Sequence, residues 1–215
     1  MAVRGIAGHG LPLLPSGLLY DRGILYSYLS WIAHAVTGSE LPAYRGLSLV
    51  AALIALWLVF TWLSRLRDRM TAVVGAALVA TSIPFWATAT SGRFYAPFLA
   101  LYLGTLLMMG RSLAAVFVLA MLSRLTHELA FTLAAAPAIA WLVDRDRRSA
   151  WWRTTAAITA GLVAAQVLLF GLHWLTPTSG ETMVRRFFLW QVLNLFERPP
   201  AGQFAIAIAN CPAGG

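Results

Sequence analysis

The chain lacks lysine altogether, has a single cysteine and carries few charged residues of either sign. Its 16 basic residues are all arginine, and eight acidic residues leave a net charge of +8. These arginines stand singly or in short clusters between apolar runs, whereas nucleic-acid-binding domains gather basic charge on one polar face. Nucleic acid is therefore excluded as the expected partner. The lone Cys211 excludes an internal disulfide and offers no metal-ligand spacing.

The scarcity of charge is matched by an abundance of apolar residues. Hydrophobic residues make up 60% of the chain and charged residues 11%, against about 45–50% and about 25% in soluble domains. Nine tryptophans and six tyrosines lie mostly near the ends of apolar runs, as at membrane–water interfaces. The composition predicts an integral membrane protein with roughly six apolar helices.

Five apolar runs are long enough to be helices that enter a membrane. The fourth run is too long for one upright crossing and slightly short for two, since a crossing needs about 20 residues. It is predicted to form two short helices that meet at Ser123 to Glu128. A shorter aromatic stretch, Gly23 to Thr37, is predicted to lie along the membrane surface. The five runs are Leu47 to Ser64, Thr71 to Thr88, Ala96 to Met109, Leu113 to Val143 and Thr154 to Leu175.

Two arginine-rich clusters, Arg65 to Arg69 and Asp144 to Arg148, indicate the orientation. Positive charge favours the cytoplasmic side, so these clusters are placed inside. Residues 1–46 then form a first external loop with the interfacial helix, residues 47–175 a transmembrane bundle, and residues 176–215 an external tail that starts a further loop. We expect a bacterial inner-membrane protein whose active face is extracytoplasmic.

Polar side chains gather on the external face in this arrangement. They mix acids that can take up a proton with arginines that can bind a phosphate, which predicts a site for an anionic lipid headgroup. The set is His9, Asp21, Arg22, Glu40, Arg45, Arg93, Tyr95, Arg124, His127, Glu128, Glu181, Arg185 and Arg186.

Several short motifs in order resemble bacterial C-type membrane glycosyltransferases related to dolichyl-phosphate-mannose protein mannosyltransferases and aminoarabinose transferases. Gly10 to Gly17, Tyr20 to Leu29 and Gly38 to Arg45 resemble that family's first external loop. Ser91 to Tyr95 resembles its external Arg-x-Tyr turn, and Leu125 to Glu128 its later Thr-His element. Together the matching pieces cover roughly residues 8 to 143.

The resemblance implies an all-helical C-type glycosyltransferase fold of about five or six spans and a polyprenyl-phosphate-linked sugar as donor. A carboxylate would activate the acceptor hydroxyl, and arginines would stabilise the departing phosphate. Arg93 and Tyr95 match the family's phosphate side, with Arg22, Arg45, His127 and Glu128 as further substrate-binding candidates. The partners implied are membrane lipid, the lipid-linked sugar and a glycan, lipid or protein acceptor. The resemblance assigns no particular cofactor and leaves a divalent metal open.

Three departures from the family pattern bear on activity. The family's acidic pair lies on a span upstream of the Pro-Ser-Gly segment, and only about ten residues precede that segment here, so Asp21 is the nearest substitute. Thr90 stands where relatives often carry a second arginine. The extra spans or soluble domain of relatives are missing. We therefore expect either a fragment of a longer protein or a gene model with a wrong start, and do not expect activity from this chain alone.

Other interpretations of the same residues stay open. Arg93 can extend its guanidinium to headgroups, Tyr95 can belong to an interfacial aromatic belt, and Asp21 can pair with Arg22. His127 beside Glu128 predicts a helix-end hydrogen bond rather than a zinc site, because a second histidine at helical spacing is missing.

Two further classes of function remain alternatives. A transporter is favoured if Leu113 to Val143 is one tilted helix, because its charges would then lie at mid-bilayer. A non-catalytic membrane scaffold predicts that replacing Arg93 has no effect on activity.

Overall fold

The computed structural model describes residues 2–14 and 19–176. The predicted external tail from residue 177 onward, with Glu181, Arg185 and Arg186, lies outside the described residues, as does part of the Pro-Ser-Gly segment. Within the described residues the fold is all-helical, apart from one isolated bridge between Leu13 and Leu19. The helices are α1 (Ala2–His9), α2 (Ile24–Thr37), α3 (Glu40–Leu66), α4 (Arg69–Thr81), α5 (Ile83–Thr90), α6 (Tyr95–Met108), α7 (Leu113–Thr126), the 3-10 helix η1 (Glu128–Ala134), α8 (Ala135–Val143) and α9 (Arg148–Trp174).

Two of these helices, α3 and α9, are long and apolar enough to cross a membrane, and a third candidate is the bent pair α4 and α5. Large apolar side chains cover the outer surface: Trp57 is 63% exposed, Leu78 68% and Val167 66%. Such a surface is costly in water and suits a lipid environment. These are the helices of a membrane protein.

The predicted second span, Thr71 to Thr88, is not one continuous helix. The chain bends by 65° between α4 and α5, with Pro84 in the first turn of α5. A proline has no N–H to donate to the preceding turn, and its ring disfavours helical geometry just before it. The Ser82 hydroxyl instead donates to the Val79 carbonyl at 2.8 Å, which closes the end of α4.

The break predicted inside Leu113 to Val143 is confirmed, because α7 ends at Thr126 and η1 begins at Glu128. The helix predicted over Gly23 to Thr37 is also confirmed as α2. The long helices begin earlier than the apolar runs predict, α3 at Glu40 and α9 at Arg148, because their polar first turns carry no hydropathy signal. The short helix α1, in the segment predicted as loop, was not foreseen.

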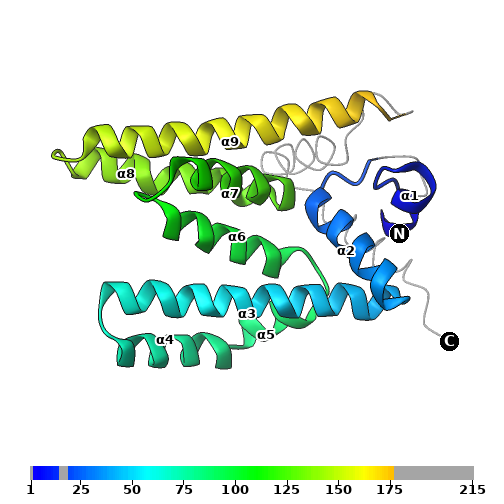
Figure 1. Ribbon diagram of the computed structural model, residues 1–215, viewed down its shortest axis with the longest axis horizontal. Coiled ribbons are helices and arrows are strands. Elements are labelled where there is room, and N and C mark those ends of the chain that lie inside the picture. Colours follow the sequence, from blue (N-terminus) through cyan, green and yellow to red (C-terminus); the bar gives the residue numbers. More distant parts are fainter. Residues whose placement is uncertain (1, 15–18, 177–215) are drawn as a thin grey trace, which may run out of the picture.

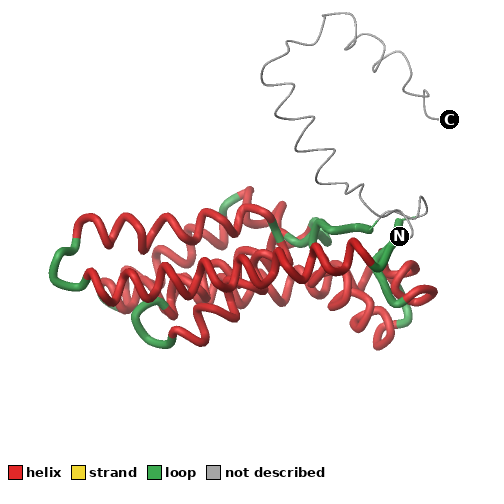
Figure 2. The backbone as a smooth tube through the Cα atoms, turned by 90° about the horizontal axis from the view of Figure 1, so that it is seen from above, coloured by secondary structure: helices red, strands yellow, loops and turns green. Residues whose placement is uncertain are grey.

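The helices lie roughly along one long axis (Figure 1). Both views place the turns α3–α4, α6–α7 and α8–α9 at one end of the bundle and α1 and α2 at the other (Figure 2). The two arginine-rich clusters therefore share one end, as the sequence predicts. The polar turn at 91–94 and the start of α2 share the opposite end.

Gly161 allows the close packing of α7 on α9. A Cβ atom at this position would meet the Phe117 carbonyl oxygen, and would lie 3.2 Å from the Met121 nitrogen and 3.3 Å from the Ala120 Cβ. Backbone atoms cannot move aside as a flexible side chain can. The helices could therefore accept a larger residue only by separating.

We expect Gly161→Ala to lower the free energy of unfolding by about 1–3 kcal/mol, the usual cost of overpacking. Gly171→Ala on the same helix is the matched control, because a Cβ there meets nothing within 4 Å. Thermal unfolding of the detergent-solubilised protein measures both. Equal unfolding midpoints for the two variants would contradict this account of the α7–α9 interface.

Candidate functional site

Gly23 brings the start of α2 against the polar turn before α6. Its φ of 71° lies in the left-handed region, and a Cβ would stand 3.0 Å from the Phe94 ring. Only glycine adopts this conformation without strain and leaves room for the ring. Two segments of the predicted site, 20–23 and 91–95, are thereby held together.

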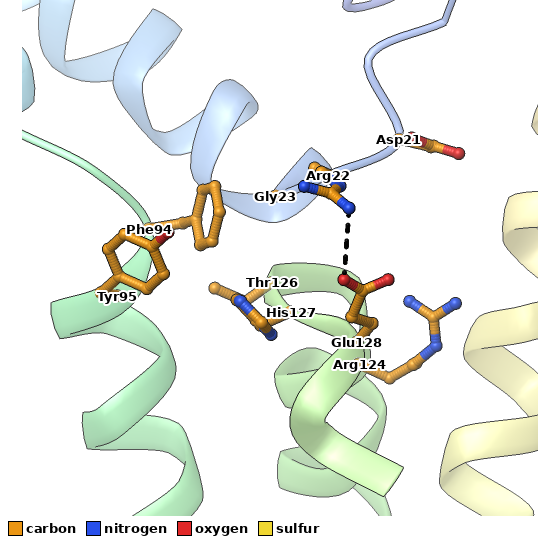
Figure 3. A pocket seen from close by; sticks show the side chains of 9 residues that line it. All are labelled: Asp21, Arg22, Gly23, Phe94, Tyr95, Arg124, Thr126, His127 and Glu128. Atoms are coloured by element: carbon orange, nitrogen blue, oxygen red, sulfur yellow. Dashed lines mark hydrogen bonds and ion pairs between the residues drawn. The ribbon is translucent and has the colours of Figure 1, made fainter. Parts of the chain in front are cut away.

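A small polar cavity of about 40 Å³ opens where these segments meet the break between α7 and η1. Arg22 Nη2 donates to Glu128 Oε1 across it at 3.4 Å (Figure 3). Side-chain exposures of 27% for Arg22 and 38% for Glu128 leave both groups accessible. The cavity is lined by Asp21, Arg22, Gly23, Phe94, Tyr95, Arg124, Thr126, His127 and Glu128.

Asp21, the predicted catalytic acid, lies at the edge of this cavity. Its side chain points away from the contact between Arg22 and Glu128 (Figure 3). Its Oδ2 lies 3.6 Å from His173 Nε2 on α9, and the Asp21 side chain is only 6% exposed. Arg22, the neighbour of Asp21 on this loop, contacts Glu128.

His127 occupies the gap between α7 and η1. Its Nδ1 accepts a hydrogen bond from the Leu129 backbone N–H at 3.0 Å, which confirms the predicted helix-end hydrogen bond. The ring centroid lies 5.2 Å from that of Phe94, 5.8 Å from Tyr95 and 5.0 Å from Phe98. Desolvation by these neighbours lowers the pKa of His127, and Arg22 and Arg124 lower it further, against the opposing effect of Glu128.

Arg124 adds a second guanidinium behind the cavity. It is 9% exposed, its Nη2 donates to Gln166 Oε1 at 2.7 Å, and it stands over the Phe131 ring at 5.0 Å. A buried arginine bonded to a neutral amide keeps its full charge available to the cavity it lines.

A larger cavity of about 430 Å³ adjoins the first and shares Arg22, Phe94 and Tyr95 with it. Among the residues that the structure describes, two arginines and four tyrosines line it and no acidic side chain does. Burial raises the pKa of Tyr20, so its hydroxyl keeps its proton and stays a donor. The lining is Leu14, Tyr20, Arg22, Tyr26, Ser27, Tyr44, Gly92, Arg93, Phe94 and Tyr95.

Hydrogen bonds from Tyr26 and Ser48 fix one wall of this larger cavity. The Tyr26 hydroxyl lies 3.1 Å from the Tyr44 carbonyl oxygen, to which it donates, and 3.2 Å from Ser48 Oγ. Ser48 Oγ in turn donates to the Arg93 carbonyl oxygen at 3.0 Å. The backbone of the Arg93 turn is therefore tied to α2 and α3, while its side chain is exposed.

An apolar groove of about 530 Å³ runs from these cavities between α2, α3, α6 and α7. It shares Tyr26 with the larger polar cavity and Thr126 with the smaller one. Within the described part of the chain, the other residues that line it carry no polar side chain: Leu25, Leu29, Leu47, Val50, Ala51, Ile54, Leu58, Pro97, Ala100, Leu101, Gly104, Met108, Leu119 and Leu122.

The fold brings most of the predicted site residues together. Asp21, Arg22, Arg93, Tyr95, His127 and Glu128 line the two adjoining polar cavities, whereas Arg45 is exposed and lies outside them. Sequence reasoning did not select Tyr20, Tyr44 or His173. A tyrosine near an apolar run is typical of an interfacial aromatic belt, so the sequence did not distinguish Tyr20 and Tyr44 from the other aromatic residues.

Comparison with protein-family models, with curated proteins and with solved structures finds no match to this chain. Among residues 2–14 and 19–176, no three His, Cys, Asp or Glu side chains lie close enough to hold a metal ion.

Proposed function

We propose that this chain is a membrane glycosyltransferase of the C type, which moves a sugar from a polyprenyl-phosphate donor to an acceptor hydroxyl. One observation carries the proposal: a polar cavity lined by arginines and tyrosines adjoins an apolar groove. A lipid-linked sugar phosphate has the same division into an anionic head and a long apolar chain. Its phosphate would bind Arg93 and Arg22, and its first isoprene units would lie in the groove.

The size and charge of the larger cavity suit the donor head. About 430 Å³ is within the usual range for a ligand pocket, about 300–1,000 Å³. Arginine guanidinium groups bind phosphate oxygens in a planar, bidentate geometry, and tyrosine hydroxyls and ring faces suit a sugar. The absence of acids from this described lining favours an anion there.

The smaller cavity supplies the proton acceptor. The acceptor oxygen would attack the anomeric carbon and pass its proton to a carboxylate, while the bond from that carbon to the phosphate oxygen breaks and polyprenyl phosphate leaves. Glu128 is our choice for this role, because its side chain is 38% exposed against 6% for Asp21. Asp21 is the second candidate.

In the membrane, we place six crossings: α3, α4 with α5, α6, α7, η1 with α8, and α9. The arginine-rich end would face the cytoplasm, so the cavities would open on the extracytoplasmic side. The short helices α6 and α7, of 14 residues each, span about 21 Å at 1.5 Å per residue. They would bring the polar end of the site partway into the bilayer.

Binding of decaprenyl phosphate in phosphatidylcholine nanodiscs tests this proposal. We expect Arg93→Gln to weaken binding about tenfold, since a hydrogen bond to a charged group contributes about 1.5 kcal/mol or more. Arg111→Gln is the matched control, because Arg111 is also exposed but belongs to the turn between α6 and α7, which lies at the opposite end of the bundle. Wild-type protein that does not bind decaprenyl phosphate contradicts the proposed function. Equal losses in both variants contradict the role of Arg93.

A further inference from the structure

The proton position on His127 follows from its hydrogen bond. A backbone N–H can only donate, so the Nδ1 atom that accepts from Leu129 carries a lone pair and no proton. A neutral imidazole with a bare Nδ1 holds its proton on Nε2. While this bond stands, His127 is neither an imidazolium nor a base at Nε2. It is a donor at Nε2.

The Nε2 atom has no hydrogen-bond partner within the part of the chain that the structure describes. The hydrogen bond from Leu129 reaches the ring at Nδ1, and the Phe94, Tyr95 and Phe98 rings around it offer no strong acceptor. The residue nevertheless lines the smaller polar cavity. Because polar groups are normally hydrogen-bonded, an N–H group at the wall of a polar cavity is available to donate to an acceptor atom of a bound ligand.

The neighbouring charged groups indicate what that acceptor is. Arg22 and Arg124 line the same cavity, with Glu128 and Asp21 as the acids. Glu128 contacts Arg22, and Asp21 faces His173. Arg22, Phe94 and Tyr95 are common to this cavity and to the larger one. A phosphate bound at Arg22 would therefore lie at the junction of the cavities, beside His127.

We propose that His127 is a fixed-tautomer hydrogen-bond donor, whose Nε2–H binds an oxygen of the lipid phosphate as this group leaves the sugar. This role rests on the proposed function and refines it: His127 stabilises the leaving group and does not accept the acceptor's proton. The aromatic rings and the bond to Leu129 hold the imidazole in place before the substrate arrives, so no ordering cost is added on binding.

The burial of His127 keeps this donor in its neutral form. Its lowered pKa extends the neutral form below the ordinary histidine value of about 6.5. Protonation adds a hydrogen at Nδ1 and breaks the bond to Leu129. The contribution of this bond to stability is therefore fully present above about pH 6.5 and is lost as the pH falls through the lowered pKa.

Two substitutions of His127 distinguish the role of Nδ1 from that of Nε2. In His127→Asn the amide oxygen can accept from Leu129 in place of Nδ1, but nothing replaces Nε2. In His127→Gln the longer amide can donate from the position of Nε2, but the bond to Leu129 is lost. We expect His127→Asn to weaken decaprenyl phosphate binding about tenfold, by loss of a hydrogen bond to a charged group. His127→Gln should bind more tightly than His127→Asn.

The reverse order of the two variants would show that the ring acts only through its bond to Leu129 and would overturn the proposal. Wild-type affinity in His127→Asn would overturn it too, while leaving the proposed function intact. Failure of the wild type to bind decaprenyl phosphate would instead overturn the proposed function, and this role of His127 with it.

The tautomer can be measured without any ligand. Nitrogen-15 NMR of the histidine-labelled protein at pH 7, assigned through the spectrum of His127→Gln, is expected to show the Nε2–H form. A proton on Nδ1, or on both nitrogen atoms, would overturn the proposal whatever the affinities are.

Discussion

Glu128→Gln is expected to slow sugar transfer about a hundredfold to ten-thousandfold, the usual contribution of a positioned general base. The amide keeps the size of the carboxylate and can still contact Arg22, but it cannot take the acceptor's proton. Because the substitution also removes a negative charge beside Arg22, decaprenyl phosphate should bind at least as tightly as in the wild type. The substitution should thus lower kcat without weakening donor binding. The rate of transfer is measured as the release of decaprenyl phosphate from the lipid-linked sugar in proteoliposomes.

Asp21→Asn is the comparison that identifies the proton acceptor. Asp21 faces His173 on α9, so its amide should alter the attachment of the 20–23 segment more than the chemistry. A larger loss of transfer in Asp21→Asn than in Glu128→Gln, at an unchanged thermal unfolding midpoint, would place the base at Asp21 instead. Equal transfer by the wild type and both variants would contradict a carboxylate base at this site.

The sequence predicts those features of the fold that depend on local pattern. A run of 31 residues from Leu113 to Val143 exceeds one crossing, so its length predicts a break, and the polar residues within it place that break at Ser123 to Glu128. The aromatic stretch that becomes α2 is too short to span, and the structure forms a helix of 14 residues there. The polar starts of α3 and α9 were missed, since hydropathy shows where a helix is apolar and not where it begins.

The bend between α4 and α5 was missed for a related reason. Hydropathy continues unbroken from Thr71 to Thr88, while the break depends on one absent N–H at Pro84. A rule based on backbone hydrogen bonds would have predicted the break, whereas a rule based on composition could not.

The contacts within the site could not be predicted from the sequence pattern, because they join residues that are far apart in the chain. Arg22 and Glu128 lie 106 residues apart in the sequence, and their contact depends on how α2 packs against α7 and on Phe94, which lies beside both Gly23 and His127. The Thr-His motif drew attention to His127, but the hydrogen-bonding state of its two nitrogen atoms depends on Leu129 and three aromatic rings. His173 was not selected, because a histidine at the end of an apolar helix gives no sign of the loop it meets.

The apolar groove allows a test of where the lipid chain lies. Gly104 on α6 lines it, and a Cβ there would lie 3.7 Å from a Leu119 methyl, an ordinary contact. Gly104→Ala should therefore bind decaprenyl phosphate like the wild type, whereas Gly104→Phe would fill the groove. In a bilayer the displaced chain returns to lipid rather than to water, so the hydrophobic effect contributes little.

The loss in Gly104→Phe should instead come from the steric conflict between the ring and the first isoprene units. Overpacking costs about 1–3 kcal/mol, which corresponds to a loss of affinity of roughly fivefold to 150-fold. A soluble hexose phosphate, which has no chain, should bind both variants equally. Measuring the binding of both ligands to Gly104→Phe in nanodiscs distinguishes the groove from the larger polar cavity. An equal loss of affinity for decaprenyl phosphate and hexose phosphate would mean that the substitution distorts the polar cavity. Unchanged affinity for both ligands would mean that the lipid chain does not lie in the groove.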